Sequence, residues 1–178
     1  MVDVSDFPED LAAILPDDWG EVARQRECGD CDACCTVLAV QDLQKAAGVA
    51  CHHLMPDGGG CKIHDLRPQI CRQFFCGWRF GFGTDNHRPD KSGVVVVLPN
   101  ELTNACNIFL DFDWDGQSTE TLPPEVALML ESLARAGAPL HIFMTGADKP
   151  IATILHKESP LMDSVKKGVG NGTDQTSD

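Results

Sequence analysis

The chain has 178 residues, a hydrophobic share of 43% and a net charge of −13. This length suits a single domain with an ordinary apolar core, so small size alone does not require disulfides or metals. The strong negative charge disfavours binding to nucleic acid or to anionic membranes, and no apolar run is long enough to form a transmembrane helix.

The first residues have neither the basic start nor the apolar stretch of a secretion signal, so we expect a cytoplasmic protein. Thiols stay reduced in that compartment, where clustered cysteines more often bind metal than form disulfides. Residues 1–27 are acidic and are expected to form an N-terminal arm with a short helix at 8–15. We expect Trp19 to anchor this arm to the rest of the protein.

Residues 28–83 are expected to form a cysteine-rich, metal-binding region. Within it, residues 37–47 are predicted to form a helix that ends at Gly48. The run 56–60 predicts a flexible loop directly before Cys61. Five aromatic residues lie between or just after the last two clustered cysteines, and they either shield a metal centre or belong to the apolar core. They are Phe74, Phe75, Trp78, Phe80 and Phe82.

Residues 84–167 are expected to form an α+β region of the same domain, followed by a disordered tail at 168–178. The predicted elements are strands at 93–98, 105–114, 140–144 and 151–156 and a helix at 121–136. The fold class is therefore α+β, in which an irregular cysteine-rich lobe packs on a small mixed sheet with one or two helices. Cys106 lies in a predicted strand and is expected to be a core thiol.

Eight of the nine cysteines fall within a short segment with the pattern C-x2-C-x2-C-C-x15-C-x9-C-x9-C-x4-C. An x2 spacing suits a turn that directs two thiolates toward one ion. Metal ligation would also stabilise a stretch that is rich in loops and glycine. We predict that all eight are metal ligands: Cys28, Cys31, Cys34, Cys35, Cys51, Cys61, Cys71 and Cys76.

The adjacent pair Cys34 and Cys35 bears on the number of centres. In extended backbone, neighbouring side chains point to opposite sides. Either the two thiols serve two different centres, or one of them binds metal and the other is spare. Eight thiols would fill two four-ligand sites, or one site with four thiols left over.

The spacing favours iron–sulfur over zinc. A C-x2-C-x2-C run with a distant fourth cysteine resembles iron–sulfur ligation, whereas structural zinc usually takes two separate C-x2-C hooks. We therefore expect a 4Fe-4S cluster, with zinc as the alternative. Histidines among the later cysteines leave a zinc or mononuclear iron site open. They are His52, His53 and His64. Arg67 and Arg72 are candidates to offset the thiolate charge, or else form surface ion pairs.

Several functions fit these residues. The first hypothesis is an iron–sulfur protein in electron transfer, redox chemistry or sensing. The second is a zinc-stabilised module without catalytic activity that binds a protein partner, and the third is an enzyme with an open cysteine/histidine iron site. A minor hypothesis is a thiol redox protein that uses Cys31 and Cys34, although it leaves the other six clustered cysteines unexplained.

The order of the cysteines, together with the steps Gly60-Cys61-x-Ile63 and Arg67-Pro68-x2-Cys71-Arg72, resembles the bacterial cysteine-cluster family of CxxCxxCC type. Members are described as zinc- or iron-chelating proteins, and the same module occurs in flagellin lysine methylases. The resemblance covers residues 27–80, and the run 88–93 before the valine strand is similar to some members. It implies metal binding and adds little about a reaction. His64 stands where many relatives have tyrosine, which argues against it as a ligand.

Overall fold

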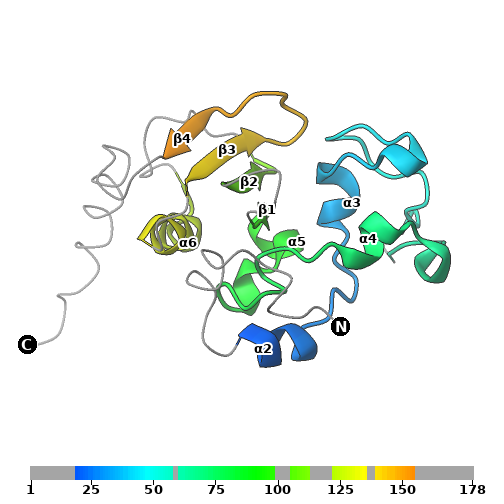
Figure 1. Ribbon diagram of the computed structural model, residues 1–178, viewed down its shortest axis with the longest axis horizontal. Helices are drawn as coiled ribbons and strands as arrows, with labels where there is room; N and C mark the ends of the chain where they lie inside the picture. Colours follow the sequence, from blue (N-terminus) through cyan, green and yellow to red (C-terminus); the bar gives the residue numbers. More distant parts are fainter. Residues whose placement is uncertain (1–18, 58–59, 99–104, 113–121, 136–138, 155–178) are drawn as a thin grey trace, which may run out of the picture.

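A computed structural model describes residues 19–57, 60–98, 105–112, 122–135 and 139–154. It shows an α+β fold built on one four-stranded sheet in the order β1-β2-β3-β4, as expected (Figure 1). The helix α2 precedes the eight clustered cysteines, and the sheet with α6 follows them. The bounds are α2 Trp19–Gln25, α3 Ala33–Val37, α4 Gln69–Gln73, α5 Pro89–Ser92, β1 Val94–Val97, β2 Cys106–Leu110, α6 Pro124–Arg135, β3 Leu140–Met144 and β4 Ala152–Ile154.

The sheet is mixed because one of its connections is a helical crossover. Strands β1 and β2 are antiparallel, β2 and β3 are parallel and joined through α6, and β3 and β4 are antiparallel. The helix begins with the expected proline and buries Val126, Leu130 and Leu133 against one face of the sheet. This packing forms the main apolar core of the described residues.

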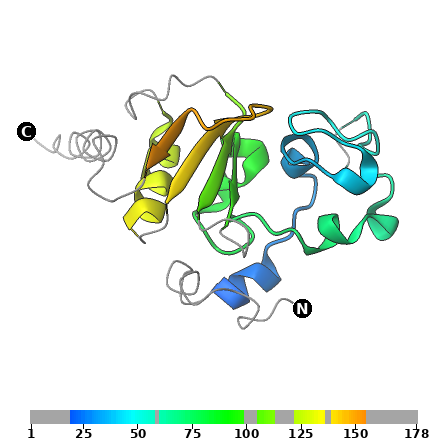
Figure 2. The same cartoon turned by 45° about the horizontal axis from the view of Figure 1, so that its top comes forward.

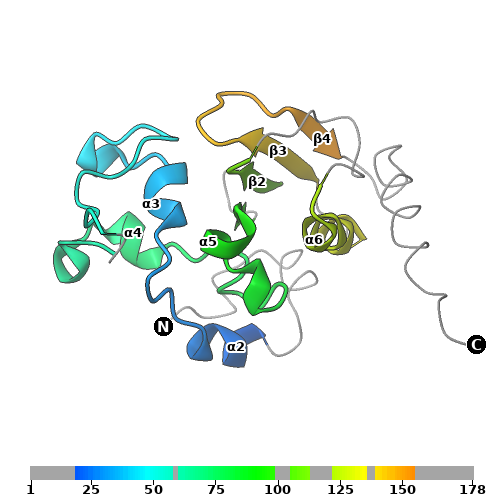
Figure 3. The same cartoon turned by 180° about the vertical axis from the view of Figure 1, so that it is seen from behind.

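Three of the four consecutive valines of β1 are buried and Val97 is half-buried, because both faces of this strand are covered. Val94 and Val96 belong to the main core with α6, whereas Val95 and Val97 pack on the opposite side. Figures 2 and 3 show the sheet between α6 and the segment that contains α3 and α4. One face of β1 therefore packs in the main apolar core, and its other face packs beside Cys76 of the cysteine-rich region.

We call residues 28–76, which contain eight of the nine cysteines, the cysteine segment. Its elements are short: besides α3 and α4 it has the 3₁₀ helices η2 (Gln41–Leu43) and η3 (His64–Leu66). The prediction of one helix over 37–47 is wrong, because α3 ends where that helix would begin. Gln44 adopts a left-handed conformation with φ 50°, and a β-bridge between Val40 and Lys45 reverses the chain.

The predicted strand 105–114 is shorter in the structure. β2 ends at Leu110, opposite Val94, the first residue of β1, and Asp111 and Phe112 form bends. The backbone N–H of Asp111 still donates a hydrogen bond of 2.8 Å to the carbonyl of Gly93. The strand pairing goes no further, because Gly93 has a positive φ of 67° and is not extended. Residues 113–114, the predicted helix 8–15, the side chain of Trp19 and the tail 168–178 lie outside the described residues.

Candidate metal centre

All nine cysteines are free thiols, and their surroundings differ. Cys106 has no exposed surface and lies in the main core, as predicted. Burial raises the pKa of its thiol to about 12, which keeps it protonated. In the cysteine segment, Cys51 and Cys76 are buried, Cys28 is exposed and the others are half-buried.

Five thiols surround one small cavity beside β1. Its volume is about 60 Å³, whereas one water molecule needs roughly 10–15 Å³, so it has room for more than a single ion. Phe74, Trp78 and Val95 supply apolar walls, and two arginines also line it. The five thiols are Cys28, Cys31, Cys34, Cys71 and Cys76. The chain therefore directs thiols from three separate parts of the cysteine segment into one partly apolar space.

A second set of thiols lies around Cys71. Burial raises the pKa of this thiol, and the neighbouring thiols Cys35, Cys51 and Cys61 raise it further. The backbone N–H of Cys51 donates a hydrogen bond of 3.0 Å to the carbonyl of Cys35, which holds these two residues side by side. Cys61 forms a β-bridge with Leu54, so a short hairpin carries its thiol. Cys71 therefore lies at the cavity and also next to the thiols of Cys35, Cys51 and Cys61.

The adjacent cysteines Cys34 and Cys35 lie on the helix α3, not in extended backbone as the sequence analysis assumed. Their thiols share a hydrogen bond, which raises the pKa of Cys34 and lowers that of Cys35 to about 7. Cys34 also interacts with Cys28 and Cys76, which are cavity thiols. This pair thus connects the thiols at the cavity, through Cys34, with those around Cys71, through Cys35.

Lys45 is a buried residue beside these thiols and is only 6% exposed. Its ammonium group donates hydrogen bonds to the carbonyls of Thr36 at 2.8 Å, Ala46 at 3.1 Å and Leu38. Burial lowers the pKa of Lys45, while nearby thiols raise it. Those thiols belong to Cys51, Cys35, Cys34 and Cys71. The sequence analysis missed Lys45, because no motif distinguishes it from a surface lysine.

Arg67 is the second cation between the two sets. It lines the cavity, and its charge favours the thiolate forms of Cys35 and Cys71. Its Nε atom is buried and has no hydrogen-bond partner within the described part of the chain. Arg72 donates hydrogen bonds to the carbonyls of Arg67 and Asp65, each at 2.8 Å, and so ties α4 to the chain before it.

The exposed end of the cavity carries a third arginine that the sequence analysis did not single out. The Nη1 atom of Arg79 lies 4.0 Å from the sulfur of Cys28, and its guanidinium lies 4.8 Å from the ring centroid of Phe75. The aromatic run is divided between the two predicted roles. Phe74 and Trp78 line the cavity, whereas Phe80 and Phe82 are part of the main core.

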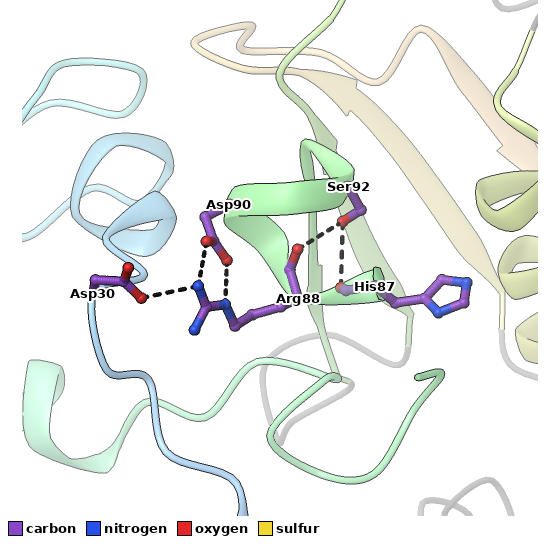
Figure 4. Close-up of polar contacts among 5 residues, drawn as sticks. All are labelled: Asp30, His87, Arg88, Asp90 and Ser92. Carbon is purple, nitrogen blue, oxygen red and sulfur yellow. Dashed lines mark hydrogen bonds and ion pairs between the residues drawn. The ribbon is translucent and has the colours of Figure 1, made fainter. Parts of the chain in front are cut away.

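Cys31 is tied to the sheet side of the protein through α5. Its thiol hydrogen-bonds to the carboxylate of Asp90, and burial raises its pKa to about 11. Arg88 binds Asp90 through two contacts of 2.6 Å and also binds Asp30 at 2.9 Å (Figure 4). This bridge fixes the first C-x2-C turn against α5.

The described side chains do not yet form a coordination site for a single metal ion. Within the described ranges, no three histidine, cysteine, aspartate or glutamate side chains are close enough together to hold a metal ion as they stand. The histidines have other neighbours: the rings of His52 and His53 are tilted by 49° with their centroids 3.9 Å apart, and His64 contacts Asp65 at 3.4 Å. The thiols are therefore gathered, but a bound ion would require their side chains to turn toward it.

Comparison with known protein families, with characterised proteins and with solved structures finds no match for this chain. Membership of the cysteine-cluster family therefore stays a prediction from the residues quoted above. Among the described helices, none has both the length and the apolar composition needed to cross a bilayer.

Proposed function

We propose that this protein binds a 4Fe-4S cluster in the cavity through Cys28, Cys31, Cys34 and Cys76, and that it acts in electron transfer, redox chemistry or sensing. The observation that carries the proposal is the cavity itself, which has five thiols in its wall and more room than one ion needs. In a cluster each thiolate binds a different iron, so the four sulfurs stand further apart than around a single ion.

The residues of the cavity fit an anionic, thiolate-bound group. The unpartnered Nε of Arg67 is a buried donor, and a buried donor without an acceptor costs about 1–3 kcal/mol. Arg79 lies beside the sulfur of Cys28 at the other end. Sulfur atoms of a cluster would accept hydrogen bonds from such donors, and donors of this kind tune the reduction potential. When bound, the cluster would supply one-electron redox chemistry.

The walls of the cavity would restrict access of water to the cluster. Trp78 and Phe74 form part of them, and Arg26 holds Trp78 in place from outside. The guanidinium of Arg26 lies 4.9 Å from the Trp78 ring centroid and donates hydrogen bonds to the carbonyls of Trp78 and Phe82. Limited solvent exposure is one of the ways in which a protein sets the potential of a cluster.

Anaerobic purification of the full chain tests the proposal. We expect a brown protein with broad visible absorption and about four iron and four sulfide per chain. Cys34→Ser and Cys76→Ser should lose this absorption, whereas Cys106→Ala, which changes a thiol of the main core, should keep it. Folded wild-type protein that contains no iron, and takes up none on reconstitution with iron and sulfide, would overturn the proposal.

A further inference from the structure

We propose that an acidic protein docks on one face of the cysteine segment and exchanges a single electron with the cluster. Four exposed residues from the end of the hairpin, η3 and α4 form this face, which we call the docking face. They are Lys62, Leu66, Ile70 and Arg72. The inference rests on the proposed function only for the electron, because docking itself needs no cluster.

The centre of the docking face is apolar. Leu66 and Ile70 are the two most exposed large hydrophobic residues of the described chain. Arg72 lies beside Leu66, because its guanidinium donates hydrogen bonds of 2.8 Å to the carbonyls of the residues before and after it, Asp65 and Arg67. Apolar side chains with charged groups at their edge are the usual composition of a protein–protein interface.

The charge of this region is opposite to that of the whole chain. Residues 61–80 contain four lysine or arginine residues and one acidic residue, Asp65, whereas the chain has a net charge of −13. Two of the four cations belong to the docking face, and the other two, Arg67 and Arg79, line the cavity. Interfaces pair surfaces of opposite charge, so this local positive excess selects a partner with a negative surface.

The docking face adjoins the cavity that would hold the cluster. Cys71 on α4 lines the cavity, while the residues before and after it, Ile70 and Arg72, are exposed. Figures 1 and 3 show α4 at the end of the molecule opposite α6. A docked carrier would thus lie across α4 from the cluster, and one electron would pass without any bond forming or breaking. Weak redox encounters use small interfaces of this kind.

Oxidation of the dithionite-reduced protein by hexacyanoferrate(III) tests the sign of the charge at the cluster. One electron leaves the reduced cluster and forms hexacyanoferrate(II), and stopped-flow absorption follows the step. We expect the rate to fall several-fold as salt rises from about 20 to about 200 mM, as between opposite charges. A rate that rises with salt would overturn the proposal, because the net charge of −13 would then govern the approach.

A fluorescein-labelled peptide of alternating glutamate and leucine tests docking without the cluster. Its fluorescence anisotropy is titrated with the full chain. Lys62→Glu should weaken binding about fivefold, and Leu66→Ala should weaken it about threefold. The matched control is Lys149→Glu, which makes the same charge change at an exposed lysine between β3 and β4. It should leave the affinity and the oxidation rate within about twofold of the wild type.

Three results would count against the docking face. Equal losses in Lys62→Glu and Lys149→Glu would overturn it, because overall charge would then explain both. A dimer in sedimentation that Lys62→Glu dissociates would also overturn it, since the face would then bind a second copy of this chain. Protein that contains iron but does not bind the peptide refutes the docking face alone, whereas iron-free protein that binds it refutes the cluster alone.

Discussion

The sheet with α6 and the cysteine segment hold their shapes in different ways. The sheet side buries aliphatic side chains completely, and Leu130, Ile108 and Ile142 have no exposed surface. The cysteine segment is built from helices of three to five residues, and it buries a lysine and two cysteines, Cys51 and Cys76, instead. Helices this short are not stable by themselves and depend on what packs around them.

The difference shows where a ligand would matter for folding. Burial of apolar surface stabilises the sheet side without help from any bound group. The cysteine segment exposes apolar residues such as Leu66 and Ile70, which are 80% and 58% exposed, while five of its cysteines line the cavity. Metal ligation would stabilise this segment as apolar burial stabilises the sheet. The same substitution should therefore have different effects on the two sides.

The largest effect is expected from Leu130→Ala in α6. Removal of a fully buried leucine leaves a cavity in the main core and should lower the free energy of unfolding by about 4 kcal/mol. Leu66→Ala is the matched control in the cysteine segment, and its cost should stay below about 0.5 kcal/mol. Urea unfolding followed by circular dichroism measures both. Similar losses in the two variants would contradict the comparison.

A smaller effect is expected where the two regions touch. Gly48 has a φ of +71°, and a Cβ there would lie 2.5 Å from the Cα of Gly146, just after β3. Gly48→Ala should therefore cost about 3 kcal/mol, from backbone strain and displaced backbone together.

Gly60 supplies the matched control for this contact. Its φ is +93°, but a Cβ there meets no atom of the described residues within 4 Å. Gly60→Ala should cost about 1 kcal/mol from strain alone. Thermal unfolding of the two variants separates strain from contact, and equal shifts in Tm would show that the two regions do not press on each other at Gly48.

The effect that is smallest near neutral pH concerns Cys106, the one cysteine of the sheet side. In the unfolded chain its thiol loses a proton near the ordinary pKa of 9.0, whereas the buried thiol keeps it up to about 12. The unfolded state then binds fewer protons, so stability falls as pH rises between these values, by about 1.4 kcal/mol per pH unit. Cys106→Ala should remove this part of the loss of stability at alkaline pH. Parallel curves of stability against pH for wild type and variant would disprove it.

Much of the fold on the sheet side follows from the sequence. The valine run 94–97, the helix that starts at paired prolines and the strand 140–144 all have the expected positions. Their patterns are local: apolar periodicity and proline position decide helix or strand over a few residues. The strand 105–114 was predicted too long, because its end is decided by the partner strand.

The cysteine segment shows the opposite case. The sequence by itself determined that eight thiols lie close along the chain, and it predicted metal as their purpose. Only the tertiary structure decided which thiols face the cavity, that Cys34 and Cys35 share a helix, and that Lys45 is buried beside them. The physical reason is that charge and hydrogen bonds act between residues far apart in the chain, and no local pattern encodes these distances.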